Sequence, residues 1–475
     1  MIDRSEILEV ATDLLLAPEV VEKDYVLGWL LAGIYRNEEL AGAWTFKGGT
    51  CLKKCYFETY RFSEDLDFTV AAETQMDGGF LGAAFTRVAE ALYDEVGLEI
   101  PVDRLRFDVY RNKRNGLSCE GRIYYRGPLG RAGDLARIKL DLTVDEVLVL
   151  PPVERQVGHP YSDMPEGGIT ARCYAYEEVF AEKVRALAER TRPRDLYDVI
   201  NLFRNGEFRP AAYAVFDVLR SKCAFKRIEV PTFASLTGAA DELLGDWQAM
   251  LGHQLPMLPP FESYWAALPE FFDWLQGGAL SAEPATAPIA AEEIVFRPAV
   301  GTLRRQGLAG SSHLEIIRFA ASNHLCVDLG YQRSIRRIEP YSLRRTQAGD
   351  ILLYAVKTET GEPRSYRLDR IESAQATSQA FTPRYAVELT PTETGPIPPA
   401  VRSAGGSGIR STQPIRSSAR ASAFQAHGPR YIYQCGMCGR KFERKTRDST
   451  LRPHKTEQGW PCSGRTGWLV ETKYR

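Results

Sequence analysis

The sequence has no run of 18 apolar residues and a mean hydropathy of -0.28, so we expect no membrane span. Its start, MIDRSEILEV, lacks the basic segment and apolar stretch of a secretory signal. Only nine cysteines occur in 475 residues, and their scatter and odd number argue against a disulfide framework. We therefore expect a cytoplasmic protein in a reducing compartment.

The composition, with 44% hydrophobic and 25% charged residues, is that of a globular protein, and the length predicts two to four domains. Strand-like and helix-like segments alternate over residues 1–285, up to a Pro/Ala-rich break at 280–293. A small domain is expected at 295–389. Residues 390–428 are rich in Pro, Gly, Ser, Ala and Arg, which predicts a flexible linker, and a compact Cys-containing module follows at 429–475.

The charge is unevenly distributed along the chain. Residues 401–475 carry 15 Lys and Arg against 4 Asp and Glu, whereas the other 400 residues carry 45 basic and 57 acidic side chains. A basic end on an acidic body is common in chains that approach a polyanion, although a solubilising tail has the same composition. Charge alone leaves both interpretations open.

The segment SEDLDF gives the strongest chemical signal. Leu66 and Phe68 alternate with Asp65 and Asp67, so a strand here would place both carboxylates on one face. Adjacent carboxylates repel each other unless a cation lies between them, and Mg²⁺ held by carboxylates and substrate phosphates meets that need. The pattern predicts a Mg²⁺ site, although solvated strand residues can also show it.

A glycine turn precedes these carboxylates. Residues 44–46 resemble a strand end, Gly48 and Gly49 predict a tight turn, and Thr50 would begin a helix of about two turns. Such a turn binds anions because its free N–H groups and the positive end of the helix dipole point the same way. We expect nucleotide phosphates there.

A third carboxylate is expected on another strand. In RIKLDLTVD the apolar residues alternate with polar ones, which predicts a half-buried strand with Asp141 on its polar face.

Two amphipathic helices carry charges on their apolar sides. Lys183 falls in the middle of the apolar arc of YEEVFAEKVRALAER. In RPRDLYDVINLF, Asp195 lies within the arc and Asp198 at its edge. Buried charges need partners. These residues could pair with one another, or Lys183 could face a triphosphate while Asp195 places the attacking group.

Taken together, these motifs resemble those of the AbiEii/AbiGii abortive-infection toxin family. The matching segments, in the family's order, are EKDYVL (22–27), KGGT (47–50), RFSEDLDF (61–68), KLDLT (139–143), FAEKVRAL (180–187) and RPRDLYDV (192–199). The resemblance covers about residues 5–270. It implies an α/β (α+β) nucleotidyltransferase fold with a helical C-terminal half, as found in toxins of type IV toxin–antitoxin systems.

The resemblance also implies roles for single residues. The nucleotide-binding turn would comprise Lys47, Gly48, Gly49 and Thr50, and Asp65 and Asp67 would bind the metal. Catalytic roles fall to Lys183 and Asp195, with Asp198 close by, and Asp141 matches the family less firmly.

Residues 313–389 resemble the WYL domain, a small Sm-like β-barrel. The matching segments are RRIEPYSL (336–343), GDILLYAV (349–356), RSYRLDRIES (364–373) and FTPR (381–384). The name-giving tripeptide is replaced by residues 351–353, Ile-Leu-Leu. A basic face is expected to bind a nucleotide or single-stranded nucleic acid, unless it is only solvated. Its residues are Arg345, Arg364, Arg367 and Arg370, beside Tyr331 and Tyr341.

The C-terminal module contains a zinc-ribbon-like ligand set. Cys435, Cys438, His454 and Cys462 can complete a tetrahedral structural Zn²⁺ site in a module too small to have a core of its own. Basic and aromatic residues around these ligands indicate contact with nucleic acid. They are Arg440, Lys441, Arg444, Lys445, Arg447, Trp460 and Trp468.

These features predict Mg²⁺-dependent transfer of a nucleoside monophosphate (NMP) from a nucleoside triphosphate (NTP) to an acceptor. RNA is expected as the acceptor, with tRNA first because related toxins modify it, and a cognate antitoxin protein is an expected partner. The chain would act as a toxin or phage-defence effector. Two alternatives remain: NMP transfer to a protein hydroxyl, and a WYL regulator whose transferase fold only binds nucleotide.

Overall fold

The computed structural model describes residues 1–57, 60–130, 133–206, 208–278, 284–296 and 311–389, and parts of the C-terminal module. Those parts are 430–435, 438, 440–444, 451, 454–456, 461–462 and 467–473. The chain forms two compact units, Met1–Ala404 and Gly405–Arg475. The predicted linker 390–428 lies outside the described residues.

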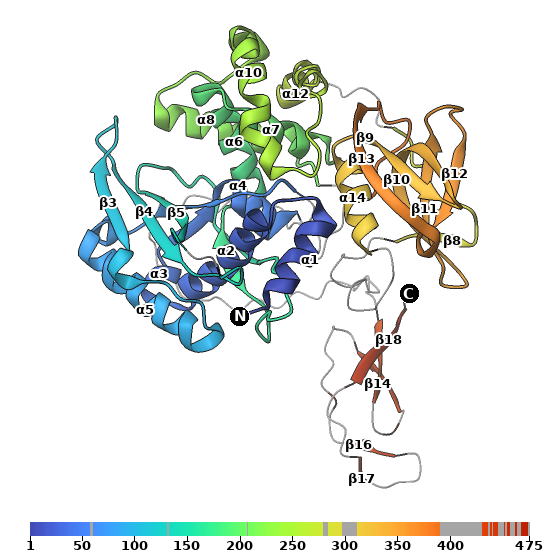
Figure 1. The fold of residues 1–475 in the computed structure, drawn as a ribbon, viewed down its shortest axis with the longest axis horizontal. Helices are drawn as coiled ribbons and strands as arrows, with labels where there is room; N and C mark the ends of the chain where they lie inside the picture. The colour runs from blue at the N-terminus through green and yellow to red at the C-terminus, as the bar shows by residue number, and fades with distance from the viewer. Residues whose placement is uncertain are drawn as a thin grey trace, which may run out of the picture. The chain divides into compact units, whose positions relative to one another are not determined.

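The first unit begins with a seven-stranded mixed sheet in the order β3-β4-β5-β2-β1-β7-β6. Its strands β3, β4 and β5 are labelled in Figure 1. Two neighbouring pairs, β2 with β5 and β1 with β7, are parallel, and the other pairs are antiparallel. The strands are β1 Trp44–Lys47, β2 Asp65–Val70, β3 Arg106–Arg111, β4 Leu117–Tyr125, β5 Ala136–Thr143, β6 Val153–Gln156 and β7 Thr170–Cys173.

Helices pack on this sheet. α2 starts with Pro18, which suits a first helical turn, and it contacts β7 and α5. α5 is capped by the Asp77 side chain and ends at Gly97, which has a positive φ of 71°. The elements are α1 Arg4–Leu14, α2 Pro18–Arg36, α3 Glu38–Ala41, α4 Gly48–Cys51, the π-helix η1 Leu52–Tyr56, α5 Gly78–Val96, and the 3₁₀ turns η2 Glu73–Gln75 and η3 Val102–Arg104.

A helical half follows the sheet, as the sequence predicts. α6 packs against α7 and α8, and its apolar arc is buried at Val179, Phe180 and Leu187. The elements are α6 Tyr176–Arg190, α7 Pro193–Arg204, α8 Ala212–Lys226, α9 Phe233–Leu236, η4 Thr237–Ala239, α10 Ala240–Leu251, η5 Gly252–Gln254, α11 Phe261–Trp265 and α12 Leu268–Leu275.

The second part of this unit is an antiparallel sheet in the order β12-β11-β10-β9-β13, with β8 paired to β10. Helix α14 contacts β9, β10 and β13. β8 begins two residues before the predicted domain start at 295, because its residues 293–295 pair with the end of β10. The elements are β8 Glu293–Val295, α14 Ser311–Ser322, β9 Leu325–Tyr331, β10 Ser334–Thr346, β11 Ile351–Lys357, β12 Pro363–Arg367, η6 Leu368–Arg370 and β13 Ile371–Ala380.

The C-terminal unit has a three-stranded sheet of β15 Lys441–Arg444, β14 Arg430–Cys435 and β18 Gly467–Lys473. The unit also has a separate two-stranded sheet of β16 His454–Lys455 and β17 Pro461–Cys462. None of the described helices is long and apolar enough to cross a membrane.

Candidate active site

Three carboxylates meet on one face of the first sheet. β2 alternates as expected: Leu66 and Phe68 are fully buried, and Asp65 and Asp67 are partly exposed. β5 pairs with β2 in parallel, with Asp141 opposite Asp67. Cross-strand partners lie on the same side of a sheet, so Asp141 shares the face of the other two carboxylates.

The electrostatics of this face favour a cation. Burial raises the pKa of Asp67 to about 6, and the neighbouring charge of Asp141 adds to the shift. Burial and Asp141 also raise the pKa of Asp65. A divalent ion would relieve this repulsion, and carboxylate oxygens are ligands that Mg²⁺ prefers. The residues therefore fit a Mg²⁺ site.

The glycine turn lies beside Asp67. β1 runs antiparallel to β2 with Lys47 opposite Asp67, and Gly48 follows with a φ of 83°. A Cβ atom on Gly48 would stand 2.3 Å from Asp67 Oδ2, and one on Gly49 would stand 2.5 Å from Arg61 Nη2. The positive φ and this close approach require glycine at position 48, whereas a side chain at position 49 would have to displace the Arg61 guanidinium. Thr50 Oγ1 donates a hydrogen bond to the Asp65 carbonyl and so joins the turn to β2.

The helix after the turn differs from the predicted two α-turns. α4 ends at Cys51 and continues as the π-helix η1, which Phe57 N closes by donating to Leu52 O at 2.9 Å. A bond five residues apart widens the helix at this point. Sequence periodicity over nine residues does not distinguish the two helix types.

Lys183, Asp195 and Asp198 meet in a buried ion cluster. Lys183 Nζ lies 2.7 Å from Asp198 Oδ2 and 3.3 Å from Asp195 Oδ1. Arg61 forms two bonds of 2.7 Å to Asp198, and Arg190 bonds Asp195 at 2.7 and 3.0 Å. Both carboxylates are at most 1% exposed. Of the two alternatives, the structure shows the pairing of Lys183 with both Asp195 and Asp198.

The cluster carries one more positive than negative charge, because three cations surround two carboxylates. Burial alone would raise the carboxyl pKa values, but Arg61 and Lys183 hold the pKa of Asp198 below its usual value. Lys183 and Arg190 likewise lower the pKa of Asp195. Both carboxylates are therefore ionised, and the cations of this cluster outnumber its carboxylates by one.

Arg61 and Arg190 were not predicted from the sequence. Two inward carboxylates facing a single lysine leave a negative excess, and this imbalance is the signal that indicates further cations. Both arginines lie in or beside the motifs already noted, RFSEDLDF and the helix of Lys183.

A cavity of about 240 Å³ joins these elements. Its wall includes the turn, Asp67 and the exposed side of the ion cluster. The lining residues are Lys47, Gly48, Gly49, Asp67, Tyr174, Val179, Glu182, Lys183, Arg185, Ala186, Glu189 and Arg190. Carboxylate, glycine turn and cations thus face one space, which suits a substrate with several phosphates.

The predicted basic face of the WYL-like domain is not a single surface. Arg345 and Arg367 lie on opposite faces of the sheet. Leu352 pairs with Arg367 on one side and with Arg344 on the other, so these three residues share a face. Arg345 follows Arg344 in the same strand and therefore points to the opposite face. Arg367 pairs with Asp350 and Asp369, and Arg364 with Glu362. Arg364 and Arg370 are exposed.

The prediction that Tyr341 lies on this face is wrong. Its side chain is fully buried, donates to Glu339 at 2.8 Å, and packs against Phe381 and Tyr385. A β-bulge between Pro340 and Ser342 breaks the alternation of β10 at this residue. Tyr331 is also buried, with 9% of its surface exposed.

The four predicted zinc ligands come together in the C-terminal unit. One atom from each of Cys435, Cys438, His454 and Cys462 lies within 4.8 Å of the others. Cys435 Sγ is 3.8 Å from Cys462 Sγ, and Cys438 Sγ is 3.3 Å from His454 Nε2. Lys445, Arg447 and Trp460 lie outside the described residues, so the predicted nucleic-acid contact there stays a prediction.

Comparisons with known proteins identify the family of the chain. Residues 29–276 match the family profile described as nucleotidyl transferase AbiEii toxin, type IV TA system. The chain belongs to this AbiEii family. It is a nucleotidyltransferase of a toxin family, and residues 312–376 match the WYL domain. None of the curated proteins compared with the chain matches it.

Solved structures similar to this AbiEii protein include nucleotidyltransferases. MenT4, the nucleotidyltransferase toxin Rv2826c from Mycobacterium tuberculosis H37Rv, is 20% identical with a TM-score of 0.40; the match covers 59% of this chain and 91% of that chain. JHP933 from Helicobacter pylori is 16% identical with a TM-score of 0.35, and the match covers 55% and 94%.

Proposed function

We propose that this AbiEii protein transfers an NMP from an NTP to RNA, with tRNA the first candidate acceptor. Asp65, Asp67 and Asp141 would hold Mg²⁺, which when bound neutralises charge on the phosphates. The observation that carries the proposal is that Asp67 and the glycine turn line one cavity, while Asp65 and Asp141 lie on the same face of the sheet as Asp67.

Each group has a defined task in this proposal. The backbone N–H groups at Gly48, Gly49 and Thr50 hold phosphate oxygens, and the two glycines allow the phosphates to approach closely. Lys183 contributes positive charge to the triphosphate. Asp195 and Asp198 fix the Lys183 ammonium, with Arg61 and Arg190 holding the carboxylates in turn. Nucleotidyl transfer needs this kind of positioning more than covalent help from the protein.

Asp195 is thus proposed as a positioning residue. Its two oxygens are taken by Arg190 and Lys183, and it is 1% exposed. A carboxylate so enclosed orients the lysine more readily than it contacts an attacking hydroxyl.

We further propose that the C-terminal cluster binds one structural Zn²⁺ and that the C-terminal unit and the WYL-like domain contact the RNA. The Cys₃His set matches the ligand types and the compactness of a tetrahedral zinc site. In the WYL-like domain the exposed Arg370, and Arg364 after release from its surface pair with Glu362, would contact phosphates.

The decisive experiment incubates the full chain with each α-³²P-labelled NTP, Mg²⁺ and total cellular RNA and separates RNA from protein. Label in the tRNA band supports the proposal. Label only on protein identifies a protein hydroxyl as the acceptor, and nucleotide binding without transfer favours the sensing regulator. Asp67→Asn is the test variant, and the exposed Asp103→Asn is its matched control.

A further inference from the structure

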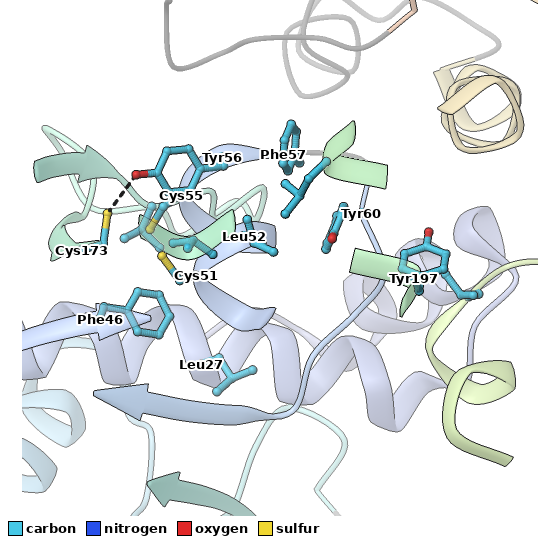
Figure 2. Packing of buried hydrophobic residues seen from close by; sticks show 14 of the residues in the cluster. Leu27, Phe46, Cys51, Leu52, Cys55, Tyr56, Phe57, Tyr60, Cys173 and Tyr197 are labelled. Carbon is cyan, nitrogen blue, oxygen red and sulfur yellow. Dashed lines mark hydrogen bonds between the residues drawn. The ribbon is translucent and has the colours of Figure 1, made fainter. Parts of the chain in front are cut away.

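Three cysteines meet in the core directly behind the glycine turn, and the proposed reaction does not use them. Cys51 ends α4, Cys55 lies in η1, and Cys173 ends β7. Their Sγ atoms lie within 4.8 Å of one another, and each residue is fully buried. Figure 2 shows the three sulfur-bearing side chains turned toward one another.

Two distant segments build this cluster. Cys51 and Cys55 are four residues apart on the wide helical turn that includes η1, so their side chains lie on one side of it. The parallel pairing of β1 with β7, in which Phe46 lies opposite Cys173, brings the third sulfur to the same place. The arrangement follows from the sheet and needs no further backbone movement.

The spacing suits a metal ion with three sulfur ligands. Metal–thiolate bonds of about 2.3 Å in a trigonal plane place the sulfur atoms about 4 Å apart, within the spread seen here. All three are free cysteines in the structure, with no disulfide among them. The geometry as it stands favours a shared ion.

The surroundings of the three sulfurs contain hydrogen-bonding groups, a cation and apolar side chains. Cys173 Sγ lies 3.9 Å from Tyr56 Oη, and the Tyr56 hydroxyl donates to Tyr174 O at 2.6 Å. Arg155 is the nearby cation: its Nε lies 3.2 Å from Cys55 O, and it interacts electrostatically with Cys55 and Cys173. Tyr35 interacts electrostatically with all three cysteines, and Lys54 with Cys55. Leu27, Phe46 and Leu52 are fully buried residues of the same core cluster (Figure 2).

We propose that Cys51, Cys55 and Cys173 form a buried site for a soft monovalent ion, Cu(I). Thiolate ligands select Cu(I). Structural Zn²⁺ takes four ligands, whereas among the described residues this group offers three. The ion displaces the thiol protons of its cysteine ligands, and these protons pass to solvent. The ion and the nearby Arg155 guanidinium offset negative charge on the sulfurs.

The burial of the site determines how it is filled. All three sulfurs are closed off from solvent in the folded chain, so the ion enters while the chain folds. Occupancy ties α4 to β7 immediately behind the phosphate turn, and the bound form unfolds at a higher temperature.

The experiment uses the full chain, purified under reducing conditions from cells grown with added copper. Copper and zinc per chain are measured by elemental analysis, and the copper coordination by X-ray absorption. Cys173→Ala and Cys51→Ala remove ligands, and Cys438→Ser disables the C-terminal cluster. Cys223→Ala, at a buried cysteine of α8 outside the group, is the matched control.

The proposal predicts about one copper with sulfur ligands in the wild type, in Cys223→Ala and in Cys438→Ser, and its loss in both ligand variants. Far-ultraviolet circular dichroism shows whether each variant is folded. Copper that is absent from the wild type, is lost with Cys438→Ser, or persists in folded Cys51→Ala overturns it, as does a disulfide among the three cysteines. Because no readout depends on NMP transfer, the result is independent of the proposed function.

Discussion

Lys47 and Asp67 are direct cross-strand neighbours, yet the Lys47 ammonium pairs with Glu182 at 2.9 Å. Glu182 in turn contacts Lys222 at 3.1 Å, so Lys47 belongs to a charge network with Glu182 and Lys222. The Asp67 carboxylate is therefore available to a bound cation. This division of charges motivates the predictions that follow.

Asp67→Asn should reduce NMP transfer by at least about 100-fold, because one of the three converging carboxylates is lost. The fold should be kept, and the melting temperature at pH 7 should be unchanged or higher, since the amide removes repulsion with Asp141. Labelled-NTP assays and calorimetry test this against Asp103→Asn. Full transfer in Asp67→Asn would contradict the proposed metal site.

The raised pKa of Asp67, about 6 against an ordinary value of 3.8, predicts a specific pH dependence. The folded state binds this proton more tightly than the unfolded chain, so the group favours folding below about pH 4. That contribution is lost as the pH rises through about 6.

Mg²⁺ binding should show the opposite trend, because protons compete with the ion below about pH 6. Melting curves between pH 4.5 and 8, with and without Mg²⁺, should show stabilisation by Mg²⁺ that grows across this range. Asp67→Asn should flatten the growth. A Mg²⁺ effect that is constant with pH in the wild type would argue against Asp67 as a ligand.

Gly48→Ala should weaken both NTP and Mg²⁺ binding. Its φ of 83° costs an alanine about 1–2 kcal/mol, and its Cβ would stand 2.3 Å from Asp67 Oδ2. Gly42→Ala is a matched control, because Gly42 has a φ of -74° and no atom lies within 4 Å of the place that an added methyl group would take. Isothermal titration with a non-hydrolysable NTP compares the two; equal affinities would remove the turn from the binding site.

Lys183→Ala and Arg61→Ala should separate chemistry from stability. After Lys183→Ala each carboxylate keeps an arginine, so the fold should survive while transfer falls steeply. Arg61→Ala leaves Asp198 with Lys183 as its remaining cation in a fully buried place and should cost about 3–5 kcal/mol of unfolding free energy. Chemical denaturation and transfer assays test the pair, and equal stability losses would contradict this division.

Cys438→Ser should release about one Zn²⁺ per chain and unfold only the C-terminal unit. The N-terminal unit should keep its melting transition, because the two units are compact by themselves. Elemental analysis and limited proteolysis measure both effects. A folded C-terminal unit in zinc-free protein would rule out a structural zinc.

Local patterns predicted what depends on neighbours in the sequence. The face shared by Asp65 and Asp67 follows from alternation on one strand, and the turn at Gly48 follows from the glycine pair. Alternation also gave the face of Asp141, but its position opposite Asp67 depends on a parallel register between strands about 70 residues apart. No local signal specifies that register.

Tyr341 shows why the WYL-like surface was harder to predict. A bulge shifts the alternation there, and covering segments from elsewhere in the chain bury the ring. The partners of Lys183 were uncertain for a related reason: the helices indicate which side chains turn inward, whereas Arg61 comes from a distant loop.

The segment that precedes β8 sets the true size of the WYL folding unit. Arg344 is 2% exposed, donates to Pro288 O at 2.6 Å and lies 3.7 Å from the centre of the Tyr354 ring, while Ala287 packs beside Tyr354. A protease cut that detached residues 284–296 would leave the buried Arg344 guanidinium without its hydrogen bond to Pro288 O. Residues 284–296 are therefore a structural component of the WYL-like domain and a poor place to divide the protein, although the WYL profile begins only at residue 312.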